Sequence, residues 1–114
     1  MTMTNLNTGI IAGSAYRGRI CGSSYNTGFV RDNSNFNGLL AATHELGHLL
    51  NLPHDGQSNA KGCVSYQADK RAASIMAPYD LAVDKYYWSR CSKKILHDFA
   101  TTKGCECMKY PYRR

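Results

Sequence analysis

The sequence lacks any long apolar run. No stretch of its 114 residues approaches the roughly 18 to 20 apolar residues that are needed to cross a bilayer. The polar start, MTMTNLNTG, also lacks the charged and apolar regions of a secretory signal peptide. We therefore expect no membrane-spanning segment, and we find no export signal in the residues present.

A basic stripe is also missing. The 14 lysines and arginines outnumber the 8 acidic residues and give a net charge of +6, but they are scattered apart from Lys93-Lys94 and Arg113-Arg114. Nucleic-acid binding would need clustered basic side chains with interleaved aromatics, and only the KYYW stretch at 85–88 offers a faint candidate. We read the charge as a solvated surface and predict no nucleic-acid partner.

The cysteines lack the paired CxxC spacing of a thiolate zinc site. Five are present, which is many for this length: Cys21, Cys63, Cys91, Cys105 and Cys107. Disulfides in an oxidising compartment are the better interpretation, with buried free thiols in a cytosolic protein as the alternative. Because five is odd, one thiol is left over or pairs outside this chain.

The apolar pattern predicts one domain with a modest core, of mixed α+β class. Short apolar runs at Gly9–Tyr16 and Thr27–Arg31 indicate two strands joined by a loop. Leucines and alanines at helical spacing predict a helix over about 38–50. Residues 55–73 are polar without a clear period and predict a loop.

Two features follow in the C-terminal part. The SIMAPYD stretch at 74–80 predicts a tight turn, because Pro78 cannot continue a helix. An apolar face at 91, 95, 96 and 99 predicts a second helix, which Ser89 or Ser92 would cap and Gly104 would end.

The chemistry is concentrated in THELGHLLNLPHD, residues 43–55. Positions four apart on a helix lie one turn above each other, so His44 and His48 can share a cation. Glu45 lies one residue round the helix, where it can act as general base on a metal-bound water. Two histidines and a glutamate at this spacing predict a metallopeptidase centre, and the third ligand decides its type.

The third ligand is predicted to be His54. A glutamate further along would be the alternative, but the only other glutamate, Glu106, lies between two cysteines at the far end. His54 can reach the metal only if the helix ends before it. Asn51 tolerates positive φ best after glycine, and Pro53 prevents the helix from resuming. The sequence thus predicts a turn that joins His54 to the other two histidines.

HELGHLLNLPHD resembles the extended HExxHxxGxxH motif of the metzincin zinc endopeptidases. Asp55, directly after the third histidine, resembles the reprolysin or adamalysin branch, which includes ADAM-type and arthropod venom or salivary metalloproteases. Asn51 stands where the family has glycine, a replacement familiar in the ADAMTS group. Met76 in SIMAPY resembles the Met-turn, whose methionine lies beneath the zinc site.

The resemblance covers nearly the whole chain from about Gly9. It implies a partial metzincin-like (zincin) domain over 1–114, with the edge and neighbouring strands at 8–31, the active-site helix and zinc motif at 38–54 and a C-terminal subdomain at 55–114. A complete catalytic domain of the family is nearly twice as long, so we expect this chain to correspond to the C-terminal half.

The resemblance also implies a cysteine pattern and a compartment. It pairs Cys63 with Cys91, and it pairs Cys21 with Cys107 or Cys105, of which the CMKYP context favours Cys107. A secreted, extracellular protein is implied by the same family.

The function implied is zinc-dependent hydrolysis of internal peptide bonds in protein substrates, with Zn²⁺ held by the three histidines and Glu45 as general base on zinc-bound water. A substrate strand would lie antiparallel to the edge strand near Gly9–Tyr16. Residues 77–79 either wall a substrate pocket or serve turn chemistry only. The alternative is a truncated, non-catalytic, disulfide-stapled binding fragment or toxin that retains the motif. No pattern indicates an oligomeric state.

Overall fold

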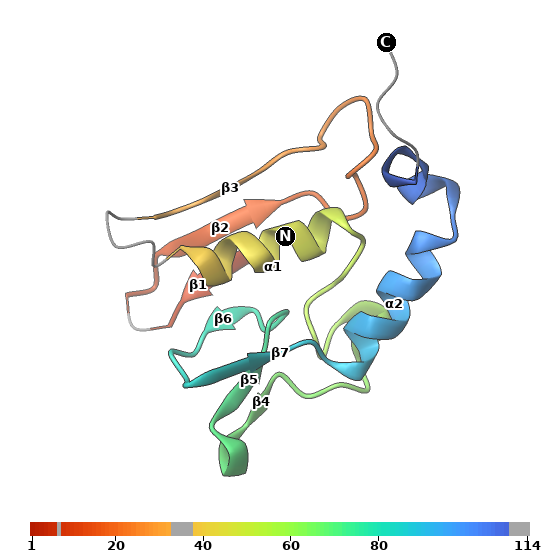
Figure 1. Cartoon of the computed structure of the whole chain (residues 1–114). Helices are drawn as coiled ribbons and strands as arrows, with labels where there is room; N and C mark the ends of the chain where they lie inside the picture. The colour runs from red at the N-terminus through yellow and green to blue at the C-terminus, as the bar shows by residue number, and fades with distance from the viewer. Residues whose placement is uncertain (7, 33–37, 110–114) are drawn as a thin grey trace.

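The computed structural model describes residues 1–6, 8–32 and 38–109 (Figure 1). Within these residues the strands form two sheets, and two α-helices flank them, as the predicted α+β class requires. The larger sheet has the order β3-β2-β1-β6, and the smaller has the order β4-β5-β7. The strands are β1 (Thr2–Asn5), β2 (Ile11–Ala15), β3 (Gly28–Val30), β4 (Tyr66–Gln67), β5 (Ala72–Ser74), β6 (Tyr79–Asp80) and β7 (Lys85–Tyr87).

Helix α1 (Leu39–Leu49) packs against the larger sheet (Figure 1). It begins without a side-chain cap, but the Gly38 amide just before it donates to Asp32 Oδ1 at 2.7 Å. Its buried face carries Ala41, Glu45 and two of the three motif histidines. The helix therefore presents the predicted site residues to the interior of the fold and not to open solvent.

Ser89 caps the N-terminus of helix α2 (Arg90–Ala100). Its Oγ accepts a hydrogen bond from the Ser92 amide at 3.0 Å. The predicted end at Gly104 is wrong. The hydroxyls of Thr101 and Thr102 donate to carbonyls of the last helical turn, and a 3-10 helix follows at Lys103–Met108. Threonine hydroxyls that bond backward to carbonyls can end a helix before a glycine is reached.

The segment predicted as a loop, 55–73, contains regular structure. Short 3-10 turns occur at Ser58–Ala60 and Ala68–Lys70, β4 lies between them, and β5 starts at Ala72. Strand β5 pairs antiparallel with β4 and parallel with β7. These strands have two or three residues, which is too few to show the alternation that identifies a strand in sequence.

The N-terminal segment forms a strand that the polar sequence did not predict. Strand β1 pairs antiparallel with β2 and parallel with β6. The amide of Thr4 donates to the carbonyl of Pro78 at 3.0 Å, which ties the start of the chain to the turn at 74–80. Strand β1 therefore lies inside the larger sheet. The prediction of an edge strand near Gly9–Tyr16 is wrong, because β2 is paired with β1 on one side and with β3 on the other.

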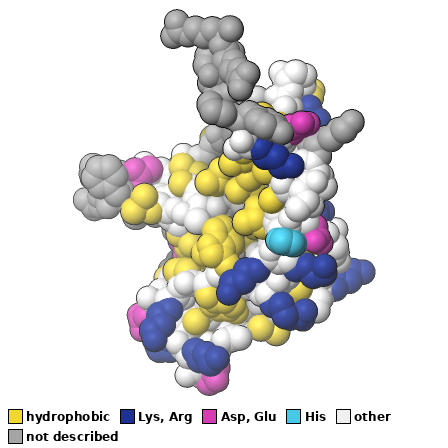
Figure 2. Space-filling view, turned by 45° about the vertical axis from the view of Figure 1, so that its right-hand side comes forward, with side chains coloured by type: hydrophobic (Ala, Val, Ile, Leu, Met, Phe, Trp, Pro, Cys, Tyr) yellow, Lys and Arg dark blue, Asp and Glu magenta, His cyan; other side chains and the backbone are white. Residues whose placement is uncertain are grey.

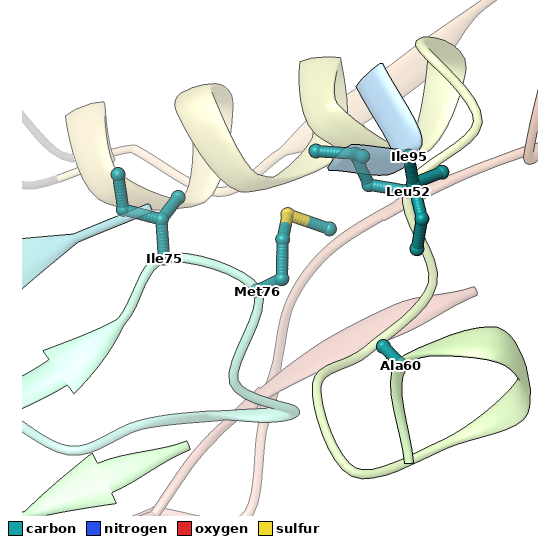
Figure 3. Close-up of a cluster of buried hydrophobic side chains, with 5 residues drawn as sticks. All are labelled: Leu52, Ala60, Ile75, Met76 and Ile95. Atoms are coloured by element: carbon teal, nitrogen blue, oxygen red, sulfur yellow. The ribbon is translucent and has the colours of Figure 1, made fainter. Parts of the chain in front are cut away.

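Between α1, α2 and the segment after α1 lies the main hydrophobic cluster. Figure 3 shows the Met76 side chain reaching toward α1, with Leu52 and Ile95 to one side of it. All five cluster members are buried: Leu52, Ala60, Ile75, Met76 and Ile95. The cluster lies directly beneath the helix that carries the first two histidines.

Two disulfides hold loops to the C-terminal part of the chain. Cys63 is bonded to Cys91 in the first turn of α2, and Cys21 is bonded to Cys107 in the 3-10 helix. Cys105 is buried and forms no disulfide with the other cysteines. The structure thus gives Cys107, not Cys105, as the partner of Cys21.

On the face that Figure 2 shows, lysine and arginine side chains lie in separate groups over the lower half, beside a band of hydrophobic side chains. Their arrangement there does not form a single continuous stripe.

Among the described helices, none is both long and apolar enough to cross a membrane.

Candidate metal centre

Three histidine side chains meet in the interior. His44 and His48 come from successive turns of α1, and His54 comes from the segment that follows the helix. One ring nitrogen from each lies within 4.8 Å of the others, and the Nε2 atoms of His48 and His54 are 3.2 Å apart. All three side chains are buried. The structure therefore brings together the three ligands that the motif predicts.

Backbone carbonyls orient the first two rings. His44 Nδ1 is 2.6 Å from the carbonyl of Ile75, and His48 Nδ1 is 2.7 Å from the carbonyl of Leu52. A carbonyl only accepts hydrogen bonds, so each Nδ1 carries the proton and each Nε2 keeps its lone pair free. His44 Nε2 is buried without a hydrogen-bond partner among the described residues. A metal ion would satisfy that nitrogen.

Burial keeps the rings uncharged. Desolvation lowers the pKa of His44 to about 4 and that of His48 to about 3. Desolvation also lowers the pKa of His54, against the opposing effect of hydrogen bonds with Gln57 and with the backbone of Thr2. Metal ligation requires neutral imidazoles, so the chemistry of this set fits a divalent ion that prefers nitrogen ligands.

The turn between α1 and His54 is made at Asn51. Its φ is 78°, in the left-handed region, and its amide donates to the carbonyl of His48 at 2.9 Å. The next amide, that of Leu52, donates to the carbonyl of Gly47 at 2.9 Å. This pair of bonds satisfies the last carbonyls of the helix, and the chain then turns back beneath α1 toward His54.

An arginine that the sequence did not single out holds this turn. Arg17 Nε donates to the carbonyl of Asn51 at 2.9 Å, and the same guanidinium reaches Asn59 Oδ1 at 2.9 Å. The neighbouring Gly18 amide donates to the carbonyl of His48 at 2.8 Å. An arginine in a glycine-rich loop gives no sequence signal for this role, because only the folded chain brings it to the turn.

Glu45 lies beside the histidines. Its side chain is 4% exposed, and Oε1 lies 3.8 Å from His48 Nε2. Neither carboxylate oxygen has a hydrogen-bond partner within the described part of the chain. Desolvation raises the pKa of Glu45 to about 7. The carboxyl group is thus placed next to the predicted metal position and is poised to exchange a proton near neutral pH.

Strand β2 comes very close to this glutamate at Gly13. A Cβ atom at Gly13 would lie 2.9 Å from both Cγ and Oε2 of Glu45. Only glycine permits this approach without displacement of the carboxylate, so β2 forms a close wall over the site.

Met76 and Asp55 support the site from the other side. Met76 is fully buried, and its carbonyl accepts the Asp55 amide at 3.0 Å. Asp55 Oδ1 accepts a hydrogen bond from Ser89 Oγ at 2.8 Å, which joins the residue after His54 to the N-terminus of α2. The Met76 carbonyl and the Asp55 side chain thus position the ligand segment. The Met76 thioether itself is a poor ligand for zinc.

The segment predicted to wall a pocket, 77–79, lies beside this support. Ala77 is 1% exposed, whereas Tyr79 is 46% exposed and belongs to β6, which pairs with β1. The structure therefore places Tyr79 at the start of β6 and leaves Ala77 and Pro78 in the turn before it.

We expect Gly47→Ala to destabilise the site. A Cβ atom at this position would lie 2.6 Å from Met76 Sδ and 3.2 Å from Met76 Cε, and Met76 is enclosed on all sides. Overpacking of this kind costs about 1 to 3 kcal/mol of unfolding free energy. Thermal denaturation measures the loss. Gly62→Ala is the matched control, because its Cβ would meet only Arg90 Nη2 at 3.9 Å, and equal stability of the two variants would contradict the prediction.

Comparisons with known proteins agree on one family. A family profile described as Metallo-peptidase family M12 matches residues 1–89. Venom metalloproteinase 3 of Eulophus pennicornis is 35% identical over 103 residues, which cover 90% of this chain and 24% of that protein. Venom metalloproteinase 2 of the same organism is 42% identical over 78 residues, which cover 68% of this chain and 19% of that protein.

A vertebrate relative shows the same similarity over a shorter stretch. The human protein named A disintegrin and metalloproteinase with thrombospondin motifs 2 is 37% identical over 71 residues, 61% of this chain and 6% of that protein. The chain spans about a quarter or less of the length of the curated relatives it matches.

Proposed function

This chain belongs to metallopeptidase family M12, and on that basis we propose that it is a zinc-dependent endopeptidase that hydrolyses internal peptide bonds of protein substrates. The observation that carries the proposal is the convergence of three buried imidazoles with a buried carboxylate beside them. Uncharged nitrogen ligands next to a carboxyl group of raised pKa are what metal-assisted hydrolysis requires.

His44, His48 and His54 are the residues that would hold zinc. Their donor set fits the ion, because three neutral imidazoles are a ligand set that catalytic zinc uses. When bound, zinc supplies Lewis acidity that polarises a carbonyl and acidifies water. The bonds from Nδ1 of His44 and His48 to backbone carbonyls hold the rings in the ligating tautomer.

Glu45 is assigned the proton transfers. Its carboxylate would accept a proton from the attacking water and pass it to the departing amine. Burial raises the pKa of Glu45 toward neutrality, which suits a group that must both take and give a proton. No other carboxyl group of the 43–55 motif faces the three rings, because Asp55 bonds to Ser89.

The substrate is proposed to be an extended peptide. Backbone pairing along β2, at the place that β1 takes in this structure, would hold it over the site, where Gly13 lies against Glu45. Two disulfides and the venom proteins among the relatives support secretion and an extracellular substrate.

Zinc titration tests the proposal directly. The disulfide-intact chain, stripped with a chelator, should take up one equivalent of zinc and cleave a quenched protein-derived peptide only after loading. Renewed chelation should stop cleavage. Stoichiometric zinc without cleavage would favour a stapled binding fragment, and failure to take up zinc would overturn the assignment of the three histidines.

A further inference from the structure

Strand β1 is inserted between two elements of the larger sheet. It pairs antiparallel with β2 and parallel with β6 (Figure 1). The Ala15 amide donates to the carbonyl of Met1, and the Thr4 amide donates to the carbonyl of Pro78, both at 3.0 Å. A short segment thus fills a slot whose two walls both offer backbone hydrogen bonds.

The inserted strand lies over the metal centre. Met3 faces Gly13 across the pair with β2, and directly opposed residues of an antiparallel pair point to the same face of the sheet. Gly13 approaches Glu45 on that face, so the Met3 side chain is directed toward α1. Met3 is 0% exposed, and the backbone of Thr2 hydrogen-bonds His54.

With β1 in this position the site is closed to solvent. His44 is 0% exposed and Glu45 is 3% exposed, and the atoms assigned to ligation and proton transfer are buried. Hydrolysis requires both water and a peptide at these atoms. A chain that cleaves peptides must therefore open the slot first.

We propose that β1 is an internal occupant of the peptide-binding slot between β2 and β6, and that a substrate must displace it to reach the metal centre. This inference rests on the proposed function, since it describes regulation of the same site. The occupant also defines the substrate class that the slot fits: an extended peptide with an unbranched apolar side chain at the place of Met3.

Strand β1 is short and irregularly paired, which favours its exchange for an external peptide. The strand has only four residues, and its register with β2 shifts between Met3 and Thr4. A ligand that binds only the open form has an apparent dissociation constant equal to its intrinsic dissociation constant divided by the fraction of open molecules. Release of β1 should therefore tighten the binding of an external peptide without any new contact.

The test uses an acetylated and amidated peptide with the sequence MTMTN, labelled for fluorescence anisotropy and titrated against the metal-free and zinc-loaded chain. Met3→Asp places a charge in the buried position and should expel β1, so the peptide should bind about tenfold or more tightly. Leu6→Asp is the matched control, because Leu6 is 55% exposed. The Leu6→Asp variant should bind the peptide with the same affinity as the unmodified chain.

Equal peptide affinity for Met3→Asp and the unmodified chain, or no binding to either, would overturn the proposal. Hydrogen exchange of the unmodified chain supplies a readout that does not depend on the variant folding. The Thr4 amide should be protected from exchange in the absence of the peptide and should lose this protection when the peptide is saturating. Continued protection would also overturn the proposal. Because the metal-free chain is titrated as well, this outcome is separate from failure of zinc uptake or cleavage.

Discussion

Glu45→Gln is expected to abolish peptide cleavage while one equivalent of zinc remains bound. Glutamine keeps the size of the side chain, but it cannot accept the proton of the attacking water. Loss of a positioned general base costs about 10² to 10⁴ in rate. The three ring nitrogens are unchanged by the substitution, so zinc affinity should stay within about twofold. Steady-state cleavage and a competitive zinc titration on the same preparation measure both quantities.

Glu106→Gln is the matched control for this experiment. The chain has only two glutamates, and Glu106 is exposed in the 3-10 helix at Lys103–Met108. Its substitution removes the same charge and should change neither cleavage nor zinc binding. Cleavage by the Glu45→Gln variant at the rate of the unmodified chain would show that Glu45 is not the base.

His54→Ala should weaken zinc binding by at least about 100-fold, because changes to residues that merely support metal ligands already cost 10- to 100-fold. The two histidines of α1 would remain, but two imidazoles cannot complete the ligand set. Competition with a chromogenic chelator measures the affinity. His97→Ala is the control, since His97 is the remaining histidine and lies exposed on α2.

The turn that delivers His54 can be tested separately. Asn51→Gly should leave zinc affinity nearly unchanged, because glycine adopts the observed φ of 78° without strain. Asn51→Val should weaken it, since a β-branched side chain at positive φ is a genuine outlier. If both variants bound zinc equally, the turn would not control the position of the third ligand.

The ligand cluster could be predicted from sequence because its geometry is mostly local. His44 and His48 are fixed by the pitch of one helix, and His54 follows after a turn whose residues have strong backbone preferences. The mixed fold was predictable for a similar reason, since α1 and α2 are long enough to show a 3.6-residue period. Local rules are sufficient where contacts are few residues apart.

The rest depends on contacts between distant segments. Strand β1 is polar and short, and it is a strand only because β2 and β6 offer backbone partners on both sides. Arg17 hydrogen-bonds to Asn51 across 34 positions of sequence. Gly13 lies against Glu45, which is also distant in sequence. No local pattern carries such information, because each of these residues would be equally acceptable in an ordinary loop.

The hydrogen bond between Asp55 and Ser89 determines the order in which the site comes apart. His44 and His48 belong to one continuous helix, whereas the position of His54 depends on a neighbour that is held by the first turn of α2. His54 and Asp55 lie outside helix and strand, so we expect their segment to open more often than α1. Heating or mild denaturant should therefore release the ion while α1 is still helical.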